Sequence, residues 1–531
     1  MSAPQSSVPV PVPVASVETE HETLLVLDFG GQYTQLIARR VREHQVFARV
    51  LPCTAPWEQI KAMNPKAIIL SGGPASVWKG GSPRCAPEVF ELGVPLLGLC
   101  YGMQLLCGEM GGVVAPAIER EFGRASIEVR NDAGLFADLP TTMEVWMSHG
   151  DRVESIPADF VVAAASDNAP FAAVRHASKP IYGLQFHPEV VHTPQGRAML
   201  GNFLFKVSGF AGDWQMASFI EQAIESMRVR IGDKRVICGL SGGVDSSVVA
   251  ALLHRAIGDK LTCIFVDNGL MRTGEVDEVE STFRPIFGDN LIVARAADQF
   301  LDLLAGEDDP EKKRKIIGHT FIDVFKEHAA QFPDAHYLAQ GTLYPDVIES
   351  ISVFGGPTAT IKSHHNVGGL PEELGFELVE PLRDLFKDEV REIGAQLGLP
   401  EAMVWRHPFP GPGLAVRFLG PVHREGLAML RKADRILLDE IESAGLMRSL
   451  WQVFCVFLPI RSVGVMGDER TYENAVAIRA VTSEEAMTAD WAELPDSLLR
   501  RVSNRIINEV RGINRVVLDI SSKPPATIEW E

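Results

Sequence analysis

The feature that most constrains this chain is the stretch Val236–Leu253, which reads VICGLSGGVDSSVVAALL. It begins with a short apolar, β-branched run, passes through a Ser-Gly-Gly turn and continues with the apolar spacing of a helix. Glycines let backbone N–H groups approach a ligand closely, and a helix N-terminus adds unpaired donors and a partial positive charge. The stretch therefore predicts a strand, a tight anion-binding loop and a helix.

The polar residues of this turn indicate a ligand that carries phosphate. Its serines add hydroxyl donors, and Asp245 is a candidate for holding Mg²⁺ against phosphate oxygens. No Lys-Ser/Thr pair follows the last glycine, which excludes a Walker A loop. An ordinary glycine-rich turn is the alternative, but a Ser-Gly-Gly-x-Asp-Ser-Ser pattern between strand and helix favours phosphate binding.

The same residues resemble the SGGxDS pyrophosphate loop of the ATP pyrophosphatases, enzymes that cleave ATP between its α- and β-phosphates. The resemblance implies that ATP is a co-substrate and that Mg²⁺ is a cofactor, with Asp245 as its ligand. The implied ATP contacts are Ser241, Gly242, Gly243, Val244, Asp245, Ser246 and Ser247.

Length and composition narrow the class of protein further. A chain of 531 residues is too long for one core, and its 46% hydrophobic content with many glycines and few aromatics favours an α/β architecture. The net charge of −19 argues against binding to nucleic acid or a membrane surface, but it permits a small nucleotide. Seven cysteines without framework spacing predict reduced thiols and a cytoplasmic location.

The sequence shows neither the pattern of a signal peptide nor that of a membrane-spanning helix. Residues 1–22 contain no Lys or Arg, and Arg39 is the first basic side chain, so a signal-peptide basic region is absent. Their Pro-Val alternation predicts a flexible tail. The longest uncharged run after it, Leu92–Gly108, contains Pro95, Gln104 and several glycines, so no membrane-spanning helix is predicted.

In the first part of the chain, the candidate chemistry centres on a cysteine between two glycines. A strand is predicted at Pro95–Leu99, and a helix follows it. In the sequence Gly98-Leu-Cys-Tyr-Gly102, the glycines permit a strained strand-to-helix turn that exposes the thiol of Cys100 beside backbone N–H groups. Those groups would stabilise a thiolate and an oxyanion. Cys107, on the helix just beyond, is expected to be a buried small hydrophobe.

Two downstream histidines are candidate bases for this thiol. A strand predicted from Ile181 ends at His187, and in extended chain Glu189 lies on the same side and can orient the imidazole. His149 has an acidic residue, Asp151, at the same offset. The local pattern leaves both histidines open.

Taken together, the motifs SGGP, GLCYGMQ and FHPE resemble those of the triad class of glutamine amidotransferases, over roughly Thr23–Gly212. The resemblance selects FHPE as the base motif. It implies that Cys100 attacks the glutamine amide, that His187 moves the proton and that Glu189 holds the imidazole. By the same resemblance, Gly73 and Tyr101 contribute the oxyanion hole and Gln104 helps to seat glutamine.

The chain is predicted to contain three domains, at residues 23–212, 213–406 and 407–531, after the tail 1–22. In the second, a strand in LTCIFVDNGLMR is expected beside the strand before the phosphate loop, so that both end at one nucleotide-binding edge. EKKRKIIG is a solvated face or a cationic lid, and the histidines of KSHHNVGGL suit a nucleotide-facing loop. The predicted class is α/β, with two doubly wound domains followed by a small α+β domain.

Further motifs extend the resemblance along nearly the whole chain, to the family of glutamine-hydrolysing GMP synthases. These motifs are VDNGLMR, EKKRKIIG, GTLYPDVIES, SHHNVGGL, EPLRDLFKDEVR, RHPFPGPGL, RSVGVMGDER and KPPATIEWE. The resemblance implies that ATP adenylates xanthosine 5′-monophosphate, with release of pyrophosphate, and that ammonia from glutamine converts the adduct to GMP and AMP.

The resemblance also implies what the third domain does. It is expected to form a homodimer and to hold the xanthosine monophosphate acceptor with its C-terminal segment. The implied acceptor contacts are Arg314, Asp388, Lys523, Ile528 and Glu529. Two alternatives are another amidotransferase of the ATP pyrophosphatase class, acting on deamido-NAD or a carboxylate, and a non-catalytic nucleotide-binding dimer.

Overall fold

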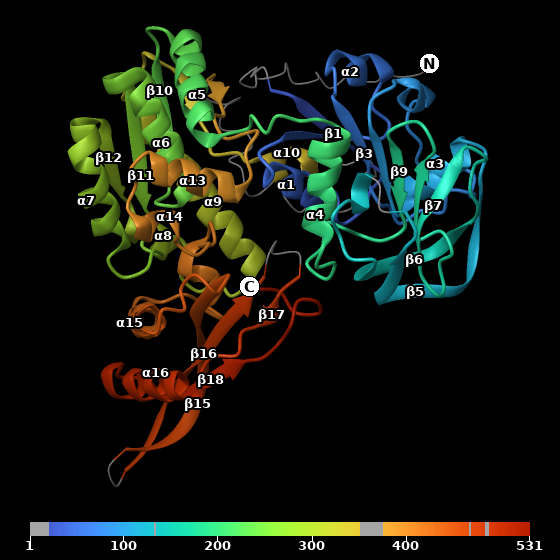
Figure 1. Cartoon of the computed structure of the whole chain (residues 1–531). Coiled ribbons are helices and arrows are strands. Elements are labelled where there is room, and N and C mark those ends of the chain that lie inside the picture. Colours follow the sequence, from blue (N-terminus) through green and yellow to red (C-terminus); the bar gives the residue numbers. More distant parts are fainter. Residues whose placement is uncertain (1–20, 132–133, 351–374, 467–468, 484–487) are drawn as a thin grey trace, which may run out of the picture. The chain divides into compact units, whose positions relative to one another are not determined.

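The computed structural model describes residues 21–131, 134–350, 375–466, 469–483 and 488–531 (Figure 1). These residues form two compact units. The N-terminal unit comprises residues 21–222 together with 343–350, and the C-terminal unit comprises 223–342 together with 375–531. None of the helices in these described residues is both long and apolar enough to cross a membrane.

A nine-stranded sheet forms the centre of the N-terminal unit, in the order β2-β1-β3-β4-β9-β8-β7-β5-β6. The first five strands in this order are parallel, and the remaining four pair antiparallel. The strands are β1 (Thr23–Asp28), β2 (Phe47–Pro52), β3 (Ala67–Leu70), β4 (Leu96–Leu99), β5 (Val113–Val129), β6 (Thr142–Ser155), β7 (Phe160–Ala165), β8 (Ala173–His176) and β9 (Ile181–Leu184).

Helices pack against the apolar strands of this unit and enclose its core. β3 and β4 are buried along their whole length because helices cover a parallel sheet on both faces, which explains their continuous apolar sequences. The helices are α1 (Thr34–Arg42), α2 (Trp57–Ala62), α3 (Tyr101–Glu109), α4 (Gly196–Gly201) and α10 (Tyr344–Ser350). Although α10 comes late in the chain, it belongs here: the N–H of Val50 donates to the Tyr344 hydroxyl at 2.5 Å.

The C-terminal unit contains a five-stranded parallel sheet in the order β12-β11-β10-β13-β14. Its strands are β10 (Arg235–Leu240), β11 (Leu261–Asp267), β12 (Leu291–Arg295), β13 (Ala335–Ala339) and β14 (Glu377–Val379). The helices that accompany it are α5 (Met216–Ile231), which links the units in sequence, α6 (Val244–Ile257), α7 (Glu275–Phe287), α8 (Ala297–Leu303), α9 (Pro310–Ala329), α13 (Lys387–Gln396) and α14 (Glu401–Val404).

A second sheet of the same unit, drawn in orange and red in Figure 1, contains β15 (Gln452–Met466), β16 (Glu469–Thr482), β17 (Asp490–Trp491) and β18 (Ile513–Asp519). β15 and β16 form a long antiparallel hairpin, and β18 runs parallel to β16. The helices α15 (Arg424–Ser443) and α16 (Asp496–Glu509) pack with it. One buried cluster joins Ile237 of the parallel sheet to Leu430 and Val453, so both sheets share a core.

The predicted class is confirmed: the chain combines a mixed sheet with a five-stranded parallel α/β sheet and a C-terminal α+β part. The predicted strand from Ile181 to His187 is shorter, because β9 ends at Leu184 and only Phe186 makes a further bridge, to Met147. The predicted tail and the KSHHNVGGL loop lie outside the described residues, apart from 21–22.

Candidate active sites

Cys100 occupies a strained turn between β4 and α3. Its backbone has φ +49° and ψ −105°, a region that a residue with a side chain rarely adopts. A Cβ at Gly98 would lie 2.6 Å from the Gly102 carbonyl carbon and oxygen, and a Cβ at Gly102 would lie 2.3 Å from the Leu70 carbonyl oxygen. Both flanking glycines are therefore required sterically, and the predicted nucleophile-elbow geometry is present.

His187 lies beside the thiol and is oriented by a carboxylate. Its Nδ1 is 2.7 Å from Oε1 of Glu189, and both side chains are buried. Burial by itself lowers the pKa of His187, but the Glu189 charge and hydrogen bonding to Cys100 outweigh it and raise the pKa to about 10. The arrangement favours a protonated imidazole beside the thiol, held in place by the Glu189 carboxylate.

The competing histidine, His149, faces different partners. Its Nδ1 lies 3.1 Å from the backbone oxygen of Asp151, and its Nε2 lies 3.4 Å from Oε2 of Glu121 on β5. A carboxylate lies near each ring, but Nε2 of His149 makes no hydrogen bond with the described residues, whereas Nδ1 of His187 is hydrogen-bonded to Glu189. Of the two bases that the local sequence leaves open, His187 is the one that is hydrogen-bonded to a carboxylate within the described residues.

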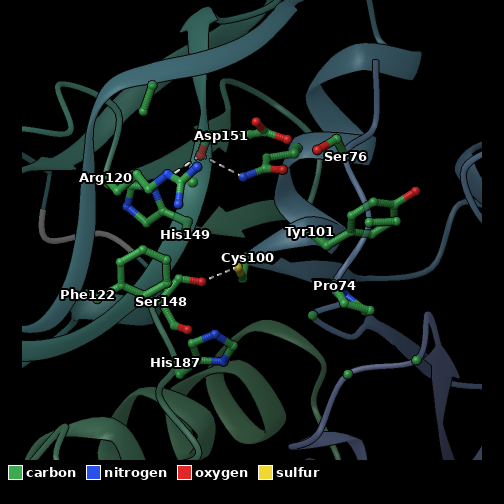
Figure 2. Close-up of a pocket in the computed structure, with 18 of the residues that line it drawn as sticks. Pro74, Ser76, Cys100, Tyr101, Arg120, Phe122, Ser148, His149, Asp151 and His187 are labelled. Atoms are coloured by element: carbon green, nitrogen blue, oxygen red, sulfur yellow. Dashed lines mark hydrogen bonds between the residues drawn. The ribbon is translucent and has the colours of Figure 1, made fainter. Parts of the chain in front are cut away.

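A cavity of about 560 Å³ surrounds the thiol and contains the predicted glutamine-site residues Gly73, Tyr101 and Gln104 in its lining. Figure 2 shows Cys100 between His187 and the segment from Ser148 to Asp151. The Ser148 carbonyl oxygen lies 3.5 Å from the Cys100 sulfur. Gly73 packs closely against Phe29, whose carbonyl oxygen would be 2.7 Å from an added Cβ, so a side chain at this position would not fit.

The predicted phosphate-site residues occupy the loop 241–243 between β10 and α6 and the first turn of α6, which begins at Val244. Gly242 has φ +76°, and the Arg406 guanidinium donates to its carbonyl oxygen at 2.8 Å. The Ser246 hydroxyl accepts from the N–H of Ser241 at 3.1 Å and lies 3.0 Å from its hydroxyl. Ser247 donates to the Gly243 carbonyl at 2.8 Å. These bonds hold the loop open in front of the helix N-terminus.

Asp245 in this loop has one oxygen available to a cation. Lys387 donates to its Oδ2 at 2.5 Å, while no donor among the described residues reaches the buried Oδ1. A single carboxylate oxygen beside a phosphate site fits Mg²⁺, which binds through one or two carboxylates together with substrate phosphates. No cluster of three or more His, Cys, Asp or Glu residues within the described ranges offers an all-protein metal site.

The predicted acceptor residues gather around the C-terminal segment. Glu529 forms a two-pronged pair with buried Arg417 at 2.8 and 3.0 Å, and Gln452 donates to it at 2.8 Å. Arg314 on α9 donates to the Glu531 backbone oxygen at 2.5 Å. Ile528 packs against the apolar cluster of β15 and β16. The segment therefore docks on its own unit.

The other two predicted acceptor residues are placed less directly. Lys523 exchanges backbone hydrogen bonds with Ala489, at 2.7 Å and 3.1 Å. Asp388 lies at the start of α13, directly after the Lys387 that contacts Asp245. The structure thus associates Arg314, Ile528 and Glu529 with the C-terminal segment, and places Asp388 next to Lys387 in the first turn of α13.

Several polar residues of these sites were missed from the sequence. Arg406 and Lys387 lie in the motifs RHPFPGPGL and EPLRDLFKDEVR, but the groups that they contact are far away in sequence. Arg417 lies outside the motifs and contacts Glu529, 112 positions later. Gln185 had a signal, because it lies in the GLQFHPEV motif two residues before His187. Its amide nitrogen is 3.8 Å from the Cys100 sulfur.

Comparison with known proteins gives three family matches. Residues 25–207 match "Glutamine amidotransferase class-I", 215–272 match "NAD synthase" and 439–530 match "GMP synthase C terminal domain". The chain is 56% identical over 510 residues to the glutamine-hydrolyzing GMP synthase of Maridesulfovibrio salexigens, covering 96% of this chain and 99% of that protein. It is 57% identical over 516 residues to that of Solidesulfovibrio magneticus, covering 97% and 100%.

Proposed function

The chain belongs to the family of glutamine-hydrolysing GMP synthases, and from that premise we propose which of its residues carry the two half-reactions. It is a glutamine-dependent ligase that uses ATP. The observation that carries the proposal is the triad arrangement in the N-terminal unit. Cys100 occupies the strained elbow, and the Nδ1 of His187 lies 2.7 Å from Glu189.

In the glutaminase half-reaction, the Cys100 thiolate attacks the side-chain amide carbon of glutamine. The oxyanion that forms is stabilised by the N–H groups of Gly73 and Tyr101. The His187 imidazolium donates its proton to the leaving ammonia, and a thioester remains. His187 then takes a proton from water, which attacks the thioester and releases glutamate and the thiolate. Glu189 keeps the imidazole in the orientation that both transfers need.

In the synthetase half-reaction, the C2 oxygen of xanthosine 5′-monophosphate attacks the α-phosphorus of ATP. The bond between the α- and β-phosphates breaks, and the pyrophosphate stays in the loop Ser241–Ser247. Ammonia then attacks C2 and displaces AMP, which leaves GMP. Adenylation is necessary because a carbonyl oxygen is a poor leaving group until it carries a phosphate ester. The N-terminus of α6 and the loop N–H groups supply positive potential to the departing pyrophosphate.

Magnesium fits the same loop. Asp245 would hold it through the buried Oδ1, next to the phosphate-binding N–H groups. When bound, it would neutralise charge on the pyrophosphate. Lys387 on the other carboxylate oxygen fixes the orientation of Asp245.

The acceptor is held, in this proposal, by Arg314, Asp388, Lys523, Ile528 and Glu529. The contacts of Glu529 with Arg417 and Gln452 support it, because they fix a carboxylate on a segment that Arg314 also touches.

We also propose a homodimer through the β15–β16 hairpin, where Ile460, Val463, Val465 and Tyr472 are each more than half exposed. A cytoplasmic location is supported by seven cysteines that are all free.

Substituting the nucleophile tests the division between the two units. Cys100→Ala is expected to lower glutamine-dependent GMP formation by on the order of 10⁴-fold or more, because the thioester cannot form. GMP formation with added ammonium is expected to persist, since the phosphate loop and the acceptor residues are untouched. The measurement is AMP and GMP formation from xanthosine monophosphate and ATP with either nitrogen source.

The matched control is Cys107→Ala, about two helical turns further along α3 and outside the cavity lining. It should retain glutamine-dependent synthesis. Loss of the ammonium-dependent reaction in Cys100→Ala, at unchanged unfolding temperature, would contradict the two-site proposal.

A further inference from the structure

Gln185 is a buried amide that no part of the proposed reaction uses, and it adjoins the reacting sulfur. Only 1% of the residue is exposed, and its Nε2 lies 3.8 Å from Sγ of Cys100. Its position follows from the sheet register. Leu99 of β4 pairs with Leu184 of β9, so the next residue of each strand, Cys100 and Gln185, emerge side by side.

The direction of this amide is determined by a chain of hydrogen bonds that begins at a backbone carbonyl. The Asp151 carbonyl oxygen can only accept, so the group of Gln104 that lies 3.0 Å from it must be Nε2. The same Nε2 lies 3.3 Å from Oε1 of Gln185. Because the carbonyl end of Gln185 is taken by this donor, its NH₂ end faces the Cys100 sulfur.

We propose that Gln185 is a catalytic residue that donates a hydrogen bond to the Cys100 sulfur and stabilises it as a thiolate, with Gln104 as the positioning residue that sets the direction of the donor. The inference rests on the proposed role of Cys100. It also gives Gln104 a task different from seating glutamine. The Nε2 of Gln104 donates two hydrogen bonds within the protein, to the Asp151 carbonyl and to Oε1 of Gln185.

The surroundings of the sulfur explain why such a donor is needed. On the opposite side, the Ser148 carbonyl oxygen lies 3.5 Å from Sγ, where it accepts from a thiol but repels a thiolate. His187 is an imidazolium only until it gives its proton to ammonia. Once ammonia has left, the sulfur is bonded in the thioester and carries no charge, while Gln185 remains beside it as a donor whose capacity does not depend on protonation. The leaving sulfur of the thioester needs the same support when water attacks.

Other charged groups also face the thiol, and they set the background for any pH measurement. The titratable residues that line the cavity around Cys100 include Tyr33, Lys79, Arg120, His149, Asp151 and His187. These groups remain in every variant considered below, so a change in the titration of the sulfur between variants reports the amide alone.

The test is the pH dependence of alkylation of Cys100 by iodoacetamide in the full chain, which reports the thiolate without requiring turnover. Background from other cysteines is measured in Cys100→Ala; burial raises the pKa of Cys53 to about 11 and of Cys107 to about 12, so they contribute little near neutrality. In Gln185→Leu, which keeps the size but lacks the donor, the midpoint is expected to rise by about one to two pH units.

Two further variants separate direction from shape. Gln185→Glu presents a carboxylate where an amide donor stood, so its midpoint should rise at least as far as that of Gln185→Leu. Gln104→Leu leaves the donor present but free to turn, and a smaller rise is expected. Glutaminase kcat should fall roughly tenfold to a hundredfold in Gln185→Leu, with a smaller change in KM. The exposed Gln59→Leu on α2 is the control and should change neither quantity.

An alkylation midpoint in Gln185→Leu equal to that of the unaltered chain would overturn the proposal, even if activity fell, because a packing role moves the unfolding temperature and leaves the titration alone. Failure of the proposed function has a different signature. If Cys100→Ala kept glutamine-dependent synthesis, the thiol would not be the nucleophile, whatever the titration of Cys100 showed.

Discussion

At the scale of single residues, Glu189 helps to determine the pKa of His187, the proposed proton donor of the glutaminase reaction. Its carboxylate and the contact with Cys100 raise the pKa of His187 to about 10, against the opposing effect of burial. The imidazolium that donates its proton to ammonia is present below that pKa and is lost as the pH rises above it. Glutaminase activity should therefore decline on the alkaline side as His187 deprotonates.

The substitution Glu189→Gln removes the charge but keeps the shape. Burial then acts on His187 with less opposition, so its pKa falls and the alkaline limb of kcat/KM moves to lower pH. Loss of the orienting acid is also expected to lower kcat by on the order of 10²- to 10⁴-fold. The measurement is kcat/KM for glutamine hydrolysis across pH 6 to about 10. An alkaline limb that stays in place would show that Glu189 does not set the charge of His187.

Candidate site residues that belong to a local sequence motif could be predicted, whereas residues whose contacts depend on the pairing of strands could not. Cys100 could be identified from its flanking glycines, and His187 from the FHPE sequence. Gln185 acquires its contact only because β4 and β9 pair with Leu99 opposite Leu184, and no sequence pattern reveals which strands become neighbours. Likewise, Arg417 and Glu529 meet across 112 positions of chain.

At the scale of elements, the phosphate loop depends on one left-handed glycine. Gly242 has φ +76°, and a Cβ there would lie 2.8 Å from the Val279 side chain on α7. Gly242→Ala is therefore expected to lower the free energy of unfolding by about 1–2 kcal/mol and to raise KM for ATP, because the strained loop moves its N–H groups. Denaturant unfolding and ATP titration of AMP formation measure the two effects.

The control for this substitution is Gly318→Ala, in the interior of α9. A Cβ at Gly318 meets nothing within 4 Å, and its φ is not in the left-handed region. It should stabilise the chain by about 0.5–1 kcal/mol, since alanine is the better helix former, and leave KM for ATP unchanged. If both variants behaved alike, the backbone of the loop would not be what holds ATP.

The elements themselves were largely predictable from apolar periodicity. The stretch Val236–Leu253 becomes β10, the loop and α6, and the strand predicted at Pro95–Leu99 becomes β4. Ends were harder, because they depend on tertiary pairing: β9 stops at Leu184, where its chain neighbours cease to pair with β4.

At the scale of the whole molecule, the β15–β16 hairpin is the surface on which assembly is expected to depend. Val465 is 71% exposed, and Val463 faces Tyr472 across the hairpin with both side chains largely open. The double substitution Val463→Asp and Val465→Asp should convert the proposed dimer into a monomer, because charges cannot be buried unpaired in an apolar interface. Analytical ultracentrifugation over a range of concentrations measures the change.

Glutaminase activity of this double variant provides the control, since both substitutions lie in the C-terminal unit and the triad lies in the other. A variant that sediments like the unaltered chain while remaining folded would move the interface elsewhere.

The elbow glycines carry a consequence for the gene. Every single-base change in a glycine codon that alters the amino acid introduces a Cβ, and at positions 98 and 102 that atom would overlap backbone atoms 2.6 Å and 2.3 Å away. In a saturation library grown without free ammonium, both positions should return synonymous codons alone. The same library supplied with ammonium should tolerate replacements that spare folding, which would map, codon by codon, the part of the gene that serves nitrogen delivery.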